Sequence, residues 1–251
     1  MKKMVVGFVS VIIITLILTS CVQKNKNKIK FNKEIVPYSK EETSDYSYEI
    51  KGTSLEVNNN CGNLKIEKSN IDKIKVRIEK LVGGKSEDKL QDALDSINCT
   101  LENEVVNINS IWKDKTTINS INVETTIIVP NSIQSINIKN NIGNVNIAGN
   151  YDDLKIQMEN GEISYNGNLK KGSIFLKIGS IDLNFQSLKS DYSYDINGEI
   201  INGKIKMPKG IEFNIIGSMA EKVKIKDEIN IDEDGALFDI NAKVGNINIE
   251  N

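Results

Sequence analysis

Short runs of alternating apolar and polar residues fill positions 135–251, and most of them are three to six residues long. This alternation has the period of a half-buried β-strand. Between the runs a short phrase recurs, in which a glycine and a polar residue precede alternating aliphatic and polar residues. The phrase begins at nearly even intervals at the first four of these glycines and returns at the fifth: Gly143, Gly161, Gly179, Gly198 and Gly245. Such spacing is typical of stacked units that cannot bury their apolar faces alone.

The recurring phrase predicts a mostly β fold, built as a repeat-based β-solenoid or as a wound β-sandwich. Two short strands and two turns in each period would form one layer of the stack. The glycines are then structural turn residues, because turns often require a positive φ. Asparagines at neighbouring turns are expected to form hydrogen-bonded ladders along the stack, with these candidates: Asn140, Asn141, Asn160 and Asn197.

One segment before the repeats has a helical period instead. In residues 86–97, Leu90, Ala93, Leu94 and Ile97 fall at i, i+3, i+4 and i+7, and Ser86 is a suitable N-cap. We therefore expect one short amphipathic helix near the N-terminal end of a single β domain, residues 43–251. Its apolar face should cover one end of the β core. The alternative interpretation is a helix that binds a partner.

The N-terminus has the pattern of a secretory signal peptide. Lys2 and Lys3 precede an apolar run, and residues 18–21 read Leu-Thr-Ser-Cys. The small residues predict cleavage between Ser20 and Cys21, which makes residues 1–20 the signal peptide. The alternative is an uncleaved anchor, but the apolar run is short for a helix that spans a membrane.

The Leu-Thr-Ser-Cys sequence resembles the lipobox of bacterial lipoproteins. This resemblance implies that Cys21 carries a diacylglyceryl group, whose two acyl chains, of the palmitate type, enter the membrane lipid. Residues 21–42 are rich in Lys, Asn and Ser and have no apolar period, so they are expected to be a flexible tether. Its lysines either rest on anionic lipid or only keep the segment soluble. The β domain would then stand at the outer face of the cell membrane.

Composition narrows the chemistry. The 32 basic and 34 acidic residues give a net charge of −2, which does not indicate binding to nucleic acid. The chain has no histidine, and this argues against an enzyme and against a metal site. Cys61 and Cys99 are either a disulfide or two buried thiols. The acidic run 232–234 lacks the ligand spacing of a calcium loop. We expect no catalytic residue, no metal and no cofactor.

The order of these motifs resembles the bacterial putative-adhesin family, a domain of unknown function. The resemblance covers residues 47–251 and rests on the helix and on four short stretches: Cys-Gly-Asn-Leu at 61–64, Thr-Thr-Ile-Ile-Val-Pro at 125–130, Gly-Asn-Val at 143–145 and Val-Gly-Asn-Ile-Asn-Ile at 244–249. It implies a location at the cell surface and a β architecture, and it brings no catalytic residues.

Together these features predict a lipid-anchored, non-enzymatic surface protein that acts as an adhesin or contacts an envelope partner. Its partners would be membrane lipid, through acylated Cys21, and an unknown protein or surface polymer. One alternative is a scaffold or sensor in an envelope-stress response. Another is a lipoprotein that binds a soluble ligand for a transporter, although a core filled by side chains leaves little room for a pocket.

Overall fold

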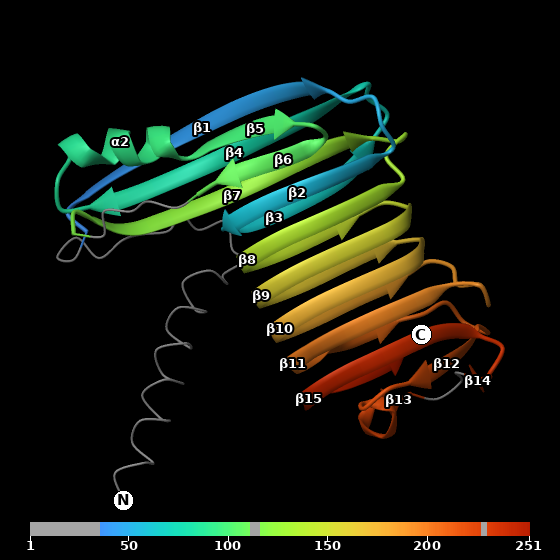
Figure 1. Ribbon diagram of the computed structural model, residues 1–251. Helices are drawn as coiled ribbons and strands as arrows, with labels where there is room; N and C mark the ends of the chain where they lie inside the picture. Colours follow the sequence, from blue (N-terminus) through green and yellow to red (C-terminus); the bar gives the residue numbers. More distant parts are fainter. Residues whose placement is uncertain (1–35, 111–115, 227–229) are drawn as a thin grey trace, which may run out of the picture.

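The computed structural model of the protein describes residues 36–110, 116–226 and 230–251. Within these ranges the strands join into one 15-stranded sheet that does not close (Figure 1). The prediction of a mostly β fold is therefore confirmed. The predicted signal peptide, its predicted cleavage site at Ser20 and Cys21, and the predicted acylation of Cys21 fall on residues outside the described ranges.

The first part of the chain forms seven strands and one helix. Their bounds are β1 (Tyr38–Glu49), β2 (Ser54–Cys61), β3 (Asn63–Ser69), β4 (Lys73–Gly84), α2 (Asp88–Ser96), β5 (Asn98–Glu102), β6 (Val105–Asn109) and β7 (Ile118–Pro130). The second part forms eight strands and a short 3₁₀ helix. Their bounds are β8 (Ser135–Ala148), β9 (Tyr151–Gly167), β10 (Leu169–Phe185), β11 (Ser193–Lys206), β12 (Glu212–Ile216), η1 (Ala220–Lys222), β13 (Lys224–Ile225), β14 (Asn230–Ile231) and β15 (Ala236–Glu250).

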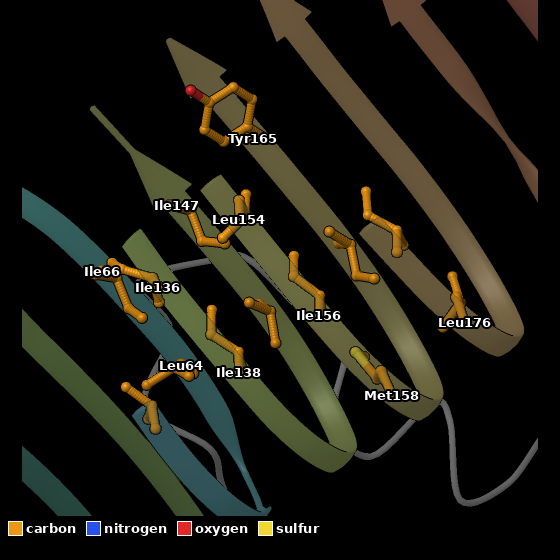
Figure 2. Close-up of a cluster of buried hydrophobic side chains, with 14 of the residues drawn as sticks. Leu64, Ile66, Ile136, Ile138, Ile147, Leu154, Ile156, Met158, Tyr165 and Leu176 are labelled. Carbon is orange, nitrogen blue, oxygen red and sulfur yellow. The ribbon is translucent and has the colours of Figure 1, made fainter. Parts of the chain in front are cut away.

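Five long strands, β8 to β11 and β15, lie parallel and side by side. The long strands drawn in Figure 2 bend back on themselves near their middle. The five strands contain 14 to 17 residues, so the prediction of strands of three to six residues is wrong. The reason is a change in side-chain alternation at the bend. In β8, Ile136 and Ile138 are buried before the bend and Val145 and Ile147 after it. This change makes one bent strand look like two short strands with a turn between them.

The bend divides the sheet into two layers with the core between them. Before its bend β8 pairs with β2, and after its bend it pairs with β3. One layer therefore holds β5, β6, β2 and the first halves of the long strands. The other holds β1, β4, β7, β3 and the second halves. Apolar side chains from both halves fill the space inside the bends, as Ile147 and Leu154 do in Figure 2.

Helix α2 packs against β1 and β4 at one end of the sheet (Figure 1). It buries Leu90, Ala93 and Leu94, in agreement with the helix predicted over residues 86–97 and with its role as a cover for one end of the core. The helix begins at Asp88, after the N-cap residue Glu87, so the prediction of Ser86 as N-cap is wrong. No side-chain hydrogen bond caps this end.

Strand β1 begins at Tyr38, inside the range predicted to be a tether (21–42). That boundary is wrong, and the β domain starts before residue 43. β1 pairs antiparallel with β4 along its whole length, from Tyr38 opposite Gly84 to Glu49 opposite Lys73. It is the edge strand of the sheet, and most of its side chains are partly or fully exposed. An exposed edge needs few apolar residues, so its sequence lacks a clear strand pattern.

Candidate binding face

The bends of the long strands are aligned by glycines. Gly143, Gly161 and Gly179 are register partners in β8, β9 and β10, and Gly245 of β15 joins the same column through Ile201 of β11. Gly198 does not belong to this column, because its register partners are Leu176 and Ala242. The predicted role of these residues as turns between strands is wrong for all five. They lie inside strands.

Close packing of successive backbones explains the glycines better than turn geometry does. A Cβ atom added to Gly179 would lie 1.9 Å from the carbonyl oxygen of Gly161, and one added to Gly198 would lie 1.9 Å from that of Leu176. Positive φ, which the turn interpretation required, occurs at Gly143, Gly161 and Gly245 and not at Gly179 or Gly198. The glycines thus hold neighbouring bends in contact, and they set the register of everything that follows the bend.

The prediction of asparagine ladders along the stack is wrong for the residues that were named. Asn140 has Met158 as its register partner in β9, so it cannot continue to Asn160. Asn140 instead accepts a hydrogen bond from Asn59 Nδ2 at 3.0 Å, and both side chains are buried. Farther along the sheet, Asn184 Nδ2 donates to Asn166 Oδ1 at 3.1 Å. Asparagines therefore link neighbouring strands in pairs.

After the bend the outward side chains form continuous polar rows across the sheet. The central row takes one residue from each of nine strands, which lie side by side from β1 to β15: Asp45, Arg77, Thr126, Lys65, Asn146, Ser164, Asp182, Lys204 and Asn248. Neighbouring strands are about 4.8 Å apart, so the row extends over roughly 40 Å. We call the surface that carries this row the polar face.

The side chains in the middle of the polar face are not hydrogen-bonded within the described residues, and the one interaction among them is the electrostatic attraction between Asp182 and Lys204. Asn146, Ser164 and Asp182 make no side-chain hydrogen bond or ion pair within the residues that the structure describes. Each is flanked along its strand by buried apolar residues, such as Ile163 and Tyr165 around Ser164, which fix the direction of the outward side chain. These groups are therefore free to bond to a ligand.

The charged side chains of the polar face are of both signs. At one end of the row Arg77 binds Asp45 through two hydrogen bonds, of 2.8 Å from Nε and 3.1 Å from a terminal nitrogen. This contact lowers the pKa of the Asp45 carboxyl below its ordinary value. At the other end Lys204 and Lys226 contact Glu250 and lower the pKa of its carboxyl, mainly through the hydrogen bond from Lys226. A face of mixed charge favours neutral polar ligands over strongly charged ones.

A groove of 620 Å³ hollows the outer surface where β1, β4 and β7 meet. It lies at one end of the polar face, and Asp45, Arg77 and Thr126 belong to both. The full lining is Asp45, Tyr46, Ser47, Lys75, Val76, Arg77, Glu79, Thr126 and Ile128. The groove gives the flat face a place where a ligand can be partly enclosed.

The opposite layer carries a smaller hollow of 310 Å³, which lies beside the turn between β5 and β6. Glu104 in this turn has a positive φ of 65°, an unusual conformation for a residue that is not glycine. Its carboxylate lies against Gly52. Because the turn has only two residues, it accounts for this conformation, and no ligand is needed to explain it.

Within the described ranges no cluster of three or more acidic or cysteine side chains could hold a metal ion. No disulfide joins Cys61 to Cys99, so of the two earlier alternatives the structure has the two thiols. Burial raises the pKa of the Cys99 thiol, which makes it a poor nucleophile.

The polar face was not predicted from the sequence, although its residues are the polar positions that alternate with buried apolar positions along each strand. Thr126 lies beside Lys65, and Lys65 beside Asn146, although both pairs are far apart along the chain. The alternation shows that each side chain points outward, but only the strand order shows that they form one row.

In the described part of the chain, no helix is long and apolar enough to cross a membrane.

Comparison with known proteins gives distant structural likenesses. The structure is similar to that of a putative cell adhesion protein from Clostridium sporogenes, with 15% identity and a TM-score of 0.42 over 84% of this chain and 99% of that chain. It is also similar to a putative adhesin from Bacteroides fragilis, with 15% identity and a TM-score of 0.47 over 84% of this chain and 97% of that chain. A putative lipid-binding protein from Parabacteroides distasonis matches at 13% identity and a TM-score of 0.27, over 83% and 96% of the two chains. No family model and no curated protein matches the chain.

Proposed function

We propose that this protein is a lipid-anchored, non-enzymatic protein of the bacterial cell surface that binds an extended surface polymer along its polar face. In this proposal the in-register bent strands are the layers of a β-solenoid. The lipobox-like sequence that ends at Cys21 supports the anchor. The polar face supports the binding role.

One observation carries the binding role: Asn146, Ser164 and Asp182, whose side chains make no hydrogen bond or ion pair in the described ranges, stand in line on adjacent strands. A row with a regular step of about 4.8 Å offers similar hydrogen-bonding groups to successive units of a chain molecule. A small ligand would use only part of such a row. A long polymer gains from many weak contacts at once, because each further contact is made within the same complex.

Binding is tested with purified cell-wall sacculi and with mucin-coated beads as probes. Ser164→Arg, combined with Asp182→Arg, places bulk and charge in the middle of the row and should reduce retention of the full chain at least tenfold. The matched control is Ser173→Arg combined with Gln157→Arg, since these two exposed residues lie on β10 and β9 before the bend. Equal retention of both double variants would contradict the role of the polar face. If the beads and sacculi retain none of these proteins, including the unaltered chain, polymer binding is contradicted.

The anchor is tested separately. Cys21→Ala should abolish incorporation of labelled palmitate and release the protein from the membrane fraction. A variant that stays membrane-bound and shows unchanged labelling would overturn the anchor. Cross-linking in living cells adds a further test, because recovery of cytoplasmic-membrane proteins in place of wall polymer would favour a scaffold in an envelope-stress response.

A further inference from the structure

The groove on β1, β4 and β7 has a charge pattern of its own within the polar face. Its lining includes two lines of register partners, each with one residue from every one of these strands: Asp45, Arg77 and Thr126 in one line, and Ser47, Lys75 and Ile128 in the other. Because the lines are two residues apart along each strand, they lie about 7 Å apart. A ligand that enters the groove therefore meets both lines.

Lys75 is an exposed cation in this lining. Its side chain makes no hydrogen bond or ion pair within the ranges that the structure describes. Its register partners, Ser47 on β1 and Ile128 on β7, are uncharged. An acid group of a ligand can therefore bind the ammonium group without displacing a carboxylate of the protein.

Arg77 keeps hydrogen-bonding capacity beside Lys75. Its Nε and one terminal nitrogen donate to the Asp45 carboxylate, yet the Arg77 side chain is 58% exposed. A guanidinium has more N–H donors than these two bonds use, and the others can bind a second acid group. Asp45 offsets one of the two cations Arg77 and Lys75, so one positive charge remains. A single acid group on a ligand would balance it.

The other end of the groove is acidic. Glu79 lies two residues beyond Arg77 on β4, on the side away from Lys75, and its register partner on β7 is Glu124. These carboxylates repel an anion from that end and leave the Lys75 end as the favourable position. Two ion pairs border the groove and add no net charge: Lys65 with Glu67, and Lys73 with Glu49.

We propose that the Lys75 end of the groove binds an acid group, a carboxylate or a phosphate, that is carried by the polymer on the polar face. Lys75 and the free donors of Arg77 would bind the acid oxygens. The hydroxyls of Ser47 and Thr126 stand on neighbouring strands and would donate to the same group. The half-buried Ile128 would pack against the apolar part of the ligand next to its acid group.

This inference rests on the proposed polymer binding and adds a selectivity to it. The polar face as a whole is of mixed charge and suits a polymer that is neutral along most of its length. The groove would select, among such polymers, those that carry acid groups.

Selectivity is tested with the full chain in detergent on three kinds of beads made from one polymer: plain dextran, carboxymethyl dextran and phosphorylated dextran. At least one of the acidic dextrans should retain the unaltered chain at least about fivefold more strongly than plain dextran does. The arm that does so identifies the acid as a carboxylate or a phosphate. Lys75→Gln should lose the preference, and Lys75→Arg should keep it. Equal retention on all three beads would overturn the proposal.

Two further variants separate the groove from general electrostatic attraction and from effects on folding. Asp45→Asn frees the guanidinium of Arg77 and should raise retention on the acidic dextran at least about twofold, a gain that a folding defect does not produce. Lys155→Gln removes the charge of an exposed lysine on β9, before the bend, and should leave the preference unchanged. Equal losses in Lys75→Gln and Lys155→Gln would contradict the assigned groove.

A failure of the proposed function gives a different result. The double variant with Ser164→Arg and Asp182→Arg would then match the unaltered chain on sacculi and mucin. The preference for acidic dextran, and its loss in Lys75→Gln, would persist.

Discussion

Gly161 packs directly on the backbone of Gly143, so closely that a Cβ atom added to Gly161 would lie 1.8 Å from the Gly143 carbonyl oxygen. The contact joins the bends of β8 and β9 in the middle of the sheet. Since Gly161 also has a φ of +143°, a larger residue is unfavourable there for two independent reasons.

Gly161→Ala should therefore lower the free energy of unfolding by at least about 2 kcal/mol, from backbone strain and overpacking together. Gly210→Ala is the matched control. Gly210 also has a positive φ, of +73°, but an added Cβ would meet nothing within 4 Å. It should lose only about 1 kcal/mol. Urea unfolding followed by circular dichroism measures both, and equal losses would show that close packing at the bend contributes little.

The hairpin between β5 and β6 should become more stable with glycine in its turn. Asn103 and Glu104 have φ values of 50° and 65°, and glutamate adopts this conformation at a cost. Glu104→Gly should raise the free energy of unfolding by about 0.5–1 kcal/mol, because strain relief exceeds the added entropy of the unfolded chain. Asn103→Gly should change it less, since asparagine tolerates this region. A loss of stability in Glu104→Gly would mean that its carboxylate contributes contacts of its own.

The buried Lys80 should link stability to pH. Its side chain is 3% exposed, and Nζ donates to Glu42 Oε1 at 2.9 Å and to the Leu94 carbonyl oxygen of α2 at 3.1 Å. Lys80→Met leaves Glu42 without its cation and removes one of the two donors to the Leu94 carbonyl oxygen, which still accepts from the Ile97 N–H. It should cost about 2 kcal/mol at pH 7. Lys73→Met removes an exposed pair with Glu49 between the same two strands and should cost less than about 0.5 kcal/mol.

The sign of the pH dependence follows from Glu42. The hydrogen bond from Lys80 lowers the pKa of the Glu42 carboxyl in the folded protein. This contribution to stability is present above the unfolded value of about 4.3 and is lost as the pH falls through the lower folded value. The difference in unfolding free energy between the unaltered chain and Lys80→Met should therefore shrink between pH 7 and pH 3. A constant difference would assign the whole effect to the Leu94 contact.

Cys99 should react with iodoacetamide much more slowly in the folded protein than in urea. Its side chain is buried, and burial raises the pKa of its thiol. In a background with Cys21→Ala, labelling of the Cys61→Ser variant measures Cys99, and labelling of Cys99→Ser measures the half-buried Cys61. Unfolding should increase the labelling rate of Cys99 by a larger factor than the labelling rate of Cys61. Equal acceleration would mean that the core around Cys99 opens readily.

The sequence predicts the parts of this fold that depend on neighbours along the chain. Helix α2 is visible because its burial repeats within one short segment, from Leu90 to Leu94. The alternation within each long strand is local too. The bend is harder to recognise in the sequence. A bend within one strand and a turn between two strands both interrupt the apolar–polar alternation next to a glycine such as Gly161.

What depends on the register between distant strands is not visible in this way. Gly198 continues the glycine spacing in sequence, yet β11 pairs with β10 so that Ile201, and not Gly198, faces Gly179. The step along the chain is longer from β10 to β11 than from β9 to β10. Gly172 of β10 pairs with Leu154 of β9, which is 18 residues earlier (172 − 154), and with Tyr194 of β11, which is 22 residues later (194 − 172). The polar face depends on the same strand order. It cannot be assembled from the alternation of single strands.

The register around β9 has a consequence for the size of the protein. Gly161 faces Gly143 in β8 and Gly179 in β10, so both neighbours of β9 pair with it at the same offset along the chain. A tandem copy of the segment 151–168 would therefore form a further strand that pairs with β9 on one side and β10 on the other, in the same register. It would lengthen the molecule by about 4.8 Å and leave both ends unchanged. The length of the stack of bent strands is thus adjustable in fixed steps by a single in-frame duplication.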